Sequence, residues 1–418
     1  MTTVSTLGAL VALAVAIVLI LRKVPPAYGM IAGALAGGLC GGADLVQTVT
    51  LMIGGAQGIT NAVMRILAAG VLAGVLIESG AAHTIAETIV RKVGETRALL
   101  ALAVATLILT AVGVFIDVAV ITVAPIALSI AQKAGISRAA ILLAMIGGGK
   151  AGNVMSPNPN TIAAADNFHV PLTSVMMAGI VPGLCGLVVA YLLARRLSDK
   201  GSRVMAEELT QHAEGARPGF AAAISAPLVA ILLLSLRPIA GIAVDPLIAL
   251  PAGGLAGALL MGRIRQCNQF MVSGLSRMAP VAIMLLGTGT LAGIIANSAL
   301  KDVLITGLTH TGLPAWLLAP LSGALMSMAT TAGTAVASGV FSSTLLELGV
   351  SGLAGAAMIH AGATVLDHLP HGSFFHATGG SVNMAVHERL KLLPYETLVG
   401  FTIAAISALM FGVFNLAG

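Results

Sequence analysis

The stretch IGGGKAGNVMSPNPN, residues 146–160, interrupts an otherwise apolar segment, and the fold assignment starts from it. Three successive glycines and two prolines cannot continue a regular α-helix. If the segment lies in a membrane, the freed backbone groups are tolerated only where they are buried in protein or line a water-filled cavity. The break therefore predicts a functional site inside the bilayer.

The composition of the chain places this break in a membrane. Of the 418 residues, 57% are hydrophobic and only 9% are charged, whereas about 25% are charged in a soluble globular protein. The first apolar stretch, residues 4–21, has no basic region before it and ends at Arg22 and Lys23. That order favours an uncleaved span over a secretory signal peptide. We expect an all-α polytopic protein of the cell inner (cytoplasmic) membrane.

Several function classes are disfavoured. The net charge of +5 does not indicate a nucleic-acid partner, because the basic residues lie in short loops, as the positive-inside rule expects. Gly149-Lys150 is followed by Ala151, so the hydroxyl residue of a P-loop is missing. The three cysteines, at 40, 185 and 267, match no metal-ligand spacing. We therefore expect no enzyme, no cofactor and no metal.

A weak internal repeat organises the chain. The triplet Leu-Ala-Gly at residues 72–74 recurs at 291–293, an offset of 219 residues. Other matches lie at offsets between 213 and 220 and are collinear, as small loop insertions would produce. The predicted domains are a first repeat at residues 1–196, a cytoplasmic linker at 197–218 and a second repeat at 219–418.

Each repeat is predicted to hold five transmembrane helices, including one broken helix, and one re-entrant hairpin. Counting the hairpins as re-entrant places almost all Lys and Arg, including Arg277 and Arg389, on the cytoplasmic side. Five is an odd number, so the second repeat is inverted and both termini lie outside. Inverted repeats with broken helices are typical of secondary transporters. The spans of the first repeat are expected near 4–22, 26–42, 58–80, 137–166 and 172–194. The hairpins are expected at 97–135 and 313–348, and the broken helices at 137–166 and 351–380.

The paired breaks predict a substrate site near the midplane, between the hairpin tips and the broken helices. Half-helix N-termini there direct partial positive charge at bound anions. Lys150 would offset the charge of a substrate carboxylate, although a purely structural cation stays an alternative. The candidate substrate-binding residues are Lys150, Asn153, Ser156, Asn158, Asn160, Thr161, Thr331, Gly333, Thr334, His371, Gly372 and Ser373.

Four residues are candidates for carrying a coupled proton. Asp117 lies in an apolar run, and an intramembrane carboxylate is by default a functional hypothesis. Histidine changes its charge near physiological pH and suits the same task. A helix cap for the aspartate and polar packing for the histidines stay open as structural alternatives. The candidates are Asp117, His360, Asp367 and His368.

The same segments resemble the gluconate:proton symporter (GntP) family, within the wider ion-transporter superfamily of elevator carriers. The similarity is collinear over nearly the whole chain, and the run Leu366–His371 is its most specific part. The chain departs from the pattern of many gluconate permeases at residues 156–161. The segments that carry the resemblance are Phe115–Val118, Ser156–Pro159, Gly333–Ser338 and Leu366–Gly372.

The resemblance implies proton-coupled symport of a small hydroxylated organic acid, such as gluconate or a related sugar acid, by elevator-type alternating access. It also implies a homodimer in the lipid bilayer. Sodium or proton coupling to another short acid (hydroxybutyrate, glycerate or citrate) or to D-serine is the alternative. A passive anion channel is less favoured, because no continuous polar stripe runs through the spans.

Overall fold

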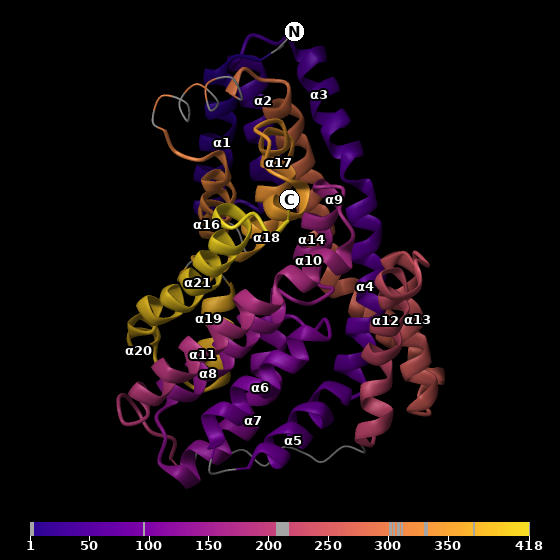
Figure 1. Ribbon diagram of the computed structural model, residues 1–418, viewed down its shortest axis with the longest axis vertical. Helices are drawn as coiled ribbons and strands as arrows, with labels where there is room; N and C mark the ends of the chain where they lie inside the picture. The colour runs from indigo at the N-terminus through magenta and orange to yellow at the C-terminus, as the bar shows by residue number, and fades with distance from the viewer. Residues whose placement is uncertain are drawn as a thin grey trace.

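The chain folds into a bundle of helices, seen in the computed structural model of Figure 1. Six helices within the described residues are long and apolar enough to cross a membrane. The expected all-α polytopic fold is therefore confirmed. The structure describes residues 4–94, 97–205, 217–300, 303, 306, 310, 312–329, 333–370 and 373–417, without the side chains of residues 238, 329 and 373.

The N-terminal part follows the predicted spans with one difference. A helix that was not predicted occupies Leu45–Gly58, directly before the third expected span. Its start is fixed by a capping box, in which Asp44 and Gln47 accept each other's backbone N–H. The helices are α1 Thr6–Leu21, α2 Pro26–Cys40, α3 Leu45–Gly58, α4 Thr60–Glu78, α5 Ala81–Val93, α6 Ala98–Ala111, α7 Ile116–Ala134, α8 Arg138–Asn153, α9 Pro159–Asn167, α10 Leu172–Ala178 and α11 Ile180–Leu197.

The C-terminal part contains a long helix and two further interrupted helix pairs. Its elements are α12 Phe220–Ala240, α13 Pro246–Leu260, a 3-10 turn η3 at Ile264–Gln266, α14 Cys267–Ala296, a 3-10 turn η4 at Ala315–Leu317, α16 Leu318–Ala329, α17 Gly333–Glu347, α18 Gly352–Gly362, α19 Ser373–Ser381, α20 Val386–Lys391, α21 Leu393–Ala408 and a π-helical turn η5 at Leu409–Val413. The interruptions between α6 and α7, α8 and α9, α16 and α17, and α18 and α19 lie inside the expected hairpins and broken helices.

Glycines let α14 lie directly against α3 and α4, and we call this contact the glycine seam. Gly55 contacts the backbone of Gly289 and Gly293, and Gly70 contacts the backbone of Gly274. A Cβ at Gly55 or Gly274 would overlap the opposite backbone. The contacts are reciprocal, because Gly274 and Gly289 follow Gly55 and Gly70 by the same 219 residues. This reciprocity supports the inverted repeat, which stays a prediction.

The broken helices exchange partners between the two parts of the chain. Helix α9 packs against α17, and α19 packs against α7. Asn167 at the end of α9 donates a hydrogen bond of 3.0 Å to Ser338 of α17. Helices α4 and α14 of the glycine seam contact α9 and α17. The hairpins and broken helices of the two parts consequently pack against one another, and Figure 1 shows α9, α17 and α18 close to α14.

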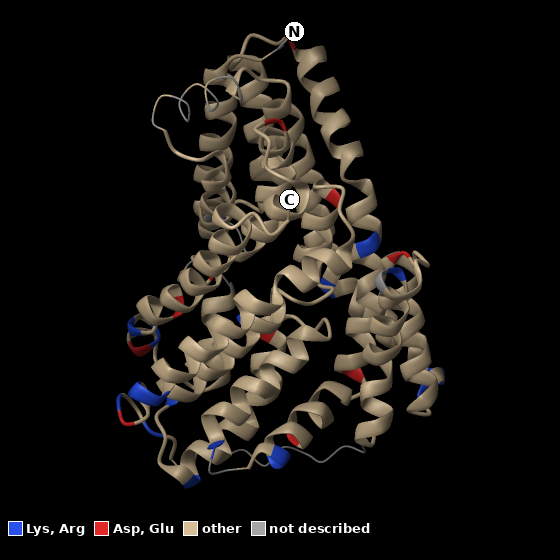
Figure 2. Cartoon of the chain, viewed as in Figure 1, with Lys and Arg blue, Asp and Glu red and all other residues tan. Residues whose placement is uncertain are grey.

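Most Lys and Arg seen in Figure 2 lie in the lower half of the view, away from the N-terminus. That distribution agrees with a cytoplasmic lower end, and the orientation of the termini stays a prediction. The cytoplasmic side expected for Arg389 stays a prediction, but this residue is not exposed in a loop. It is 1% exposed, pairs with the buried Glu396, and lies 4.8 Å from the ring centre of Phe375. A buried charge requires such a partner, which the loop position did not reveal.

Candidate functional site

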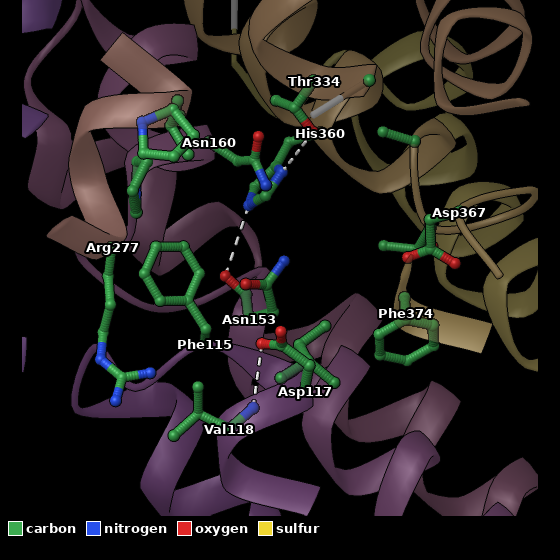
Figure 3. A pocket seen from close by; sticks show the side chains of 17 residues that line it. Phe115, Asp117, Val118, Asn153, Asn160, Arg277, Thr334, His360, Asp367 and Phe374 are labelled. Atoms are coloured by element: carbon green, nitrogen blue, oxygen red, sulfur yellow. Dashed lines mark hydrogen bonds between the residues drawn. The ribbon is translucent and has the colours of Figure 1, made fainter. Parts of the chain in front are cut away.

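A cavity of about 450 Å³ lies where the interruptions meet (Figure 3). Its wall combines the hairpin tips, the broken helices and the middle of α14. This is the position expected for a substrate site of a secondary transporter. The predicted site residues that line the cavity are Asp117, Asn153, Asn160, Gly333, Thr334, His360 and Asp367.

The starts of four helices face this cavity. Ile116 begins α7, Pro159 begins α9, Gly333 begins α17, and Phe374 is the second residue of α19; all four line the wall. The N-terminus of a helix carries unsatisfied N–H groups and about half a unit of positive charge. Four converging N-termini make the cavity favourable for an anion.

Two predicted residues hold the first break in shape without lining the cavity. Asn158 caps α9, accepting hydrogen bonds from the backbone N–H of Asn160 at 2.8 Å and of Thr161 at 3.1 Å. Its amide donates to the carbonyl oxygen of Asn153 at 2.6 Å and to Ser156 Oγ at 2.8 Å. The break is thereby ordered before any ligand arrives. Asn160 Oδ1 is buried and has no hydrogen-bond partner among the described residues.

His360 joins three of the converging elements. The ring is 2% exposed, with Nε2 3.1 Å from Thr161 Oγ1 and Nδ1 3.0 Å from Thr334 Oγ1. Nε2 also lies 3.4 Å from the carbonyl oxygen of Asn153, which only accepts. This geometry favours the proton on Nε2, so that Nδ1 accepts from Thr334. The imidazole therefore ties α18 to α9 and to the tip of the second hairpin.

Lys150 lies behind the cavity wall and is 0% exposed. Its ammonium group donates to Thr364 O at 2.5 Å and to Asp367 Oδ1 at 2.6 Å, and lies 3.1 Å from His368 Nδ1. His368 Nε2 lies 3.2 Å from the carbonyl oxygen of Leu393, which fixes the proton on that nitrogen and leaves Nδ1 as acceptor. All three N–H groups of the lysine are thus used within the protein.

Asp117 is the other carboxylate in the wall. It lies in the first turn of α7, half-buried, and accepts one hydrogen bond of 2.9 Å from the N–H of Val118. No Lys or Arg of the described chain forms an ion pair with it, unlike Asp367. Among the described residues its carboxylate therefore has no ion-pair partner in the cavity.

Sequence reasoning missed Arg277 as a site residue. It was expected only as one of the basic residues on the cytoplasmic side. In the structure it lies on α14 and lines the cavity, beside Phe115 in Figure 3. Its Nη2 lies 3.3 Å from Oε1 of Glu78, which also accepts from Ser273 at 2.6 Å. The sequence feature that could have indicated a site here is Pro280, which follows Arg277 by three residues inside the same apolar run.

Three predicted residues lie outside the described part of the chain: Thr331, His371 and Gly372. The backbone of Ser373 begins α19, and its side chain is not described. Their roles stay predictions.

The helical fold, the broken helices and the cavity between them together define a membrane transporter. The chain belongs to the GntP permease family: residues 4–252 match the model of the GntP family permease. Residues 221–311 match that of the Na⁺-H⁺ antiporter family. Membership makes the protein a permease rather than an enzyme.

Relatives cover the whole chain. It is 72% identical to an uncharacterized transporter of Haemophilus influenzae, over 99% of this chain and 100% of that protein. It is 26% identical to a gluconate permease of Pseudomonas aeruginosa, over 92% of both chains. It is 23% identical to the high-affinity gluconate transporter of Escherichia coli, over 93% of this chain and 94% of that one.

A solved structure shares the fold. The crystal structure of the YdaH transporter of Alcanivorax borkumensis superposes with a TM-score of 0.69 at 16% identity, over 98% of this chain and 99% of that one.

Proposed function

We propose that the protein is a secondary active transporter that carries a small hydroxylated organic acid, such as gluconate or a related sugar acid, together with protons. The four helix starts favour an anion, and the amide and hydroxyl groups of Asn153, Asn160 and Thr334 suit its hydroxyl groups. The relatives named as gluconate transporters support this substrate class. The coupling proposal rests on the carboxylate of Asp117, which lines the same cavity and has no ion-pair partner among the described residues.

Coupling follows from charge. A substrate carboxylate and the Asp117 carboxylate in one cavity repel each other, and a proton on Asp117 removes the repulsion. Binding of the anion and of the proton then favour each other, and this reciprocal linkage is what symport requires. Asp367 needs no proton for this purpose, because Lys150 already balances its charge.

Alternating access would use the two kinds of wall around the cavity. Arg277, Pro280 and Val281 come from α14, which the glycine seam holds against α3 and α4. The other lining residues come from the hairpins and broken helices. We propose that the latter group moves as an elevator along α4 and α14. A homodimer would keep the seam helices fixed in the bilayer during this movement.

The test is uptake of labelled gluconate into sodium-free proteoliposomes with an inward proton gradient. Concentrative uptake that a protonophore abolishes is the expected result. Asp117→Asn should retain gluconate exchange at equal pH and lose accumulation, whereas the exposed Asp199→Asn, with the same change of charge, should keep both. Undiminished uphill uptake by Asp117→Asn would remove Asp117 from the coupling role.

Sodium coupling is the second candidate, favoured by the match of residues 221–311 to the Na⁺-H⁺ antiporter family. Under an inward sodium gradient at equal pH, uptake would then appear where the proton gradient alone gives none. Glycerate, hydroxybutyrate, citrate and D-serine as competitors identify the preferred acid in either case. Equilibration without accumulation under both gradients would indicate a passive channel.

A further inference from the structure

The cavity holds two carboxylates in different electrostatic states. Asp117 has no cationic partner in the described chain, whereas Asp367 lies 2.6 Å from the ammonium group of Lys150. We propose that Asp367 is the specificity-determining residue that selects hydroxylated acids over unsubstituted acids of the same chain length. This inference rests on the proposed function, since it assigns a role within the same site.

Lys150 keeps Asp367 ionised without leaving net charge at this point of the wall. The lysine is 0% exposed and has its three N–H groups on Thr364 O, Asp367 Oδ1 and His368 Nδ1. The lysine and the aspartate together carry no net charge, so the pair does not repel an anionic substrate.

The paired carboxylate still has a free acceptor. Its hydrogen bond from Lys150 uses Oδ1, while the side chain is 22% exposed and lines the cavity. An ionised carboxylate only accepts hydrogen bonds, so Oδ2 can bind a hydroxyl group and gains nothing from a methylene. Hydrogen bonds to an ionised acceptor are roughly twice as strong as neutral ones.

A second polar side chain, Asn160 of α9, lines the cavity on a different side from Asp367 (Figure 3). A hydroxyl group of the substrate can donate to Asp367 Oδ2, whereas an alkyl chain leaves this acceptor without a hydrogen bond once water is expelled. A site of this kind rejects the ligand that lacks the hydroxyl groups.

The experiment compares gluconate with hexanoate, and 3-hydroxybutyrate with butyrate, as ligands of the purified full chain. Affinities come from ligand-induced shifts of thermal unfolding, which need no ion gradient. The wild type should prefer each hydroxylated acid at least tenfold. The double variant Lys150→Met/Asp367→Asn, which preserves the charge balance, should lower this preference tenfold or more. Asp199→Asn, at an exposed position outside the cavity, is the control and should keep the preference.

The outcomes separate this inference from the proposed function. An unchanged preference in the folded double variant would overturn the role of Asp367, even if proton-driven uptake is intact. Conversely, absence of uphill uptake by the wild type contradicts the proposed coupling and leaves the binding comparison valid. If the double variant does not fold, Asp367→Glu serves instead, because it keeps the charge and displaces the acceptor by one methylene. Equal preference in Asp367→Glu and the wild type would also overturn the inference.

Discussion

Lys150 and Asp367 are 217 residues apart in the sequence, yet the lysine Nζ lies 2.6 Å from the aspartate Oδ1. The lysine belongs to α8, before the first break, and the aspartate follows α18, before α19. One ion pair therefore joins the two broken helices directly behind the cavity. Because Lys150 is 0% exposed, this bond supports both the structure of the site and its charge.

Asp367→Asn should destabilise the protein strongly. It leaves the buried ammonium group of Lys150 without its counter-charge, and breaking a buried pair in this way costs about 3–5 kcal/mol. Adding Lys150→Met should restore much of the loss, because the buried charge is then absent. Thermal unfolding of the detergent-solubilised wild type and variants measures this. Additive effects of the two substitutions would show that the residues do not act as a pair.

Gly55→Ala should destabilise the glycine seam, whereas Gly54→Ala should not. A Cβ at Gly55 meets the backbone of α14, while a Cβ at Gly54, on the same helix, has no atom within 4 Å. Overpacking of this kind costs about 1–3 kcal/mol, and alanine at an open helical position gains about 0.5–1 kcal/mol over glycine. The thermal unfolding temperature should thus fall in Gly55→Ala and stay unchanged or rise in Gly54→Ala. Equal behaviour of both would contradict the close contact.

Arg277→Gln should raise KM for an anionic substrate about tenfold, with a smaller effect on the maximal rate. Its guanidinium group is the cation that α14 contributes to the cavity, and a hydrogen bond to a charged group is worth about 1.5–3 kcal/mol. Arg265→Gln removes the same charge from an exposed position near the start of α14 and is the control. Initial rates in proteoliposomes measure both. Indistinguishable KM values for the two variants would exclude a role of Arg277 in substrate binding.

Asp245 should give the protein a pH-dependent stability below about pH 4. It precedes α13 and accepts two hydrogen bonds from Arg65, at 3.0 and 2.6 Å. These bonds hold the pKa of its carboxyl group below the ordinary value of 3.8. Because the folded pKa is the lower one, the contribution is present above pH 3.8 and is lost as the pH falls through the folded pKa.

Asp245→Asn is the variant that tests this dependence. Asparagine still caps α13, so the variant removes one of the two carboxylate partners of Arg65 and leaves its ion pair with Asp166. The difference in unfolding temperature between wild type and variant should be largest at neutral pH and should vanish in acid. A difference that does not change with pH would assign the effect to packing instead.

The sequence predicted the interruptions well, because glycine and proline act locally. The break at residues 154–158 between α8 and α9 is visible in the run of prolines and asparagines alone. The positions of several cavity residues, such as Asp117 and Asn160, followed from the same breaks. Which residues point into the cavity did not follow, because that depends on contacts between distant segments.

Lys150 and Arg277 illustrate why the sequence alone does not show which charged residues line the cavity. Both are single charges in apolar runs, yet one is enclosed by three acceptors and the other lines the cavity. Only the packing of α18 against α9 and of α14 against α4 distinguishes them. Helix α3 was missed for a different reason. Its capping box was present in the sequence, but the search for long apolar runs passed over its polar first turn.

The glycine seam also constrains how the protein is made. Gly55 precedes Gly289, its contact across the glycine seam, by 234 residues and is therefore translated much earlier. Before α14 is inserted, the glycine face of α3 and α4 that later contacts α14 is in contact with lipid. Contacts of such large sequence separation form late and slowly. Assembly of this permease is therefore completed only after most of the chain has been translated, and a truncated N-terminal product would have an exposed glycine face for quality-control proteases to recognise.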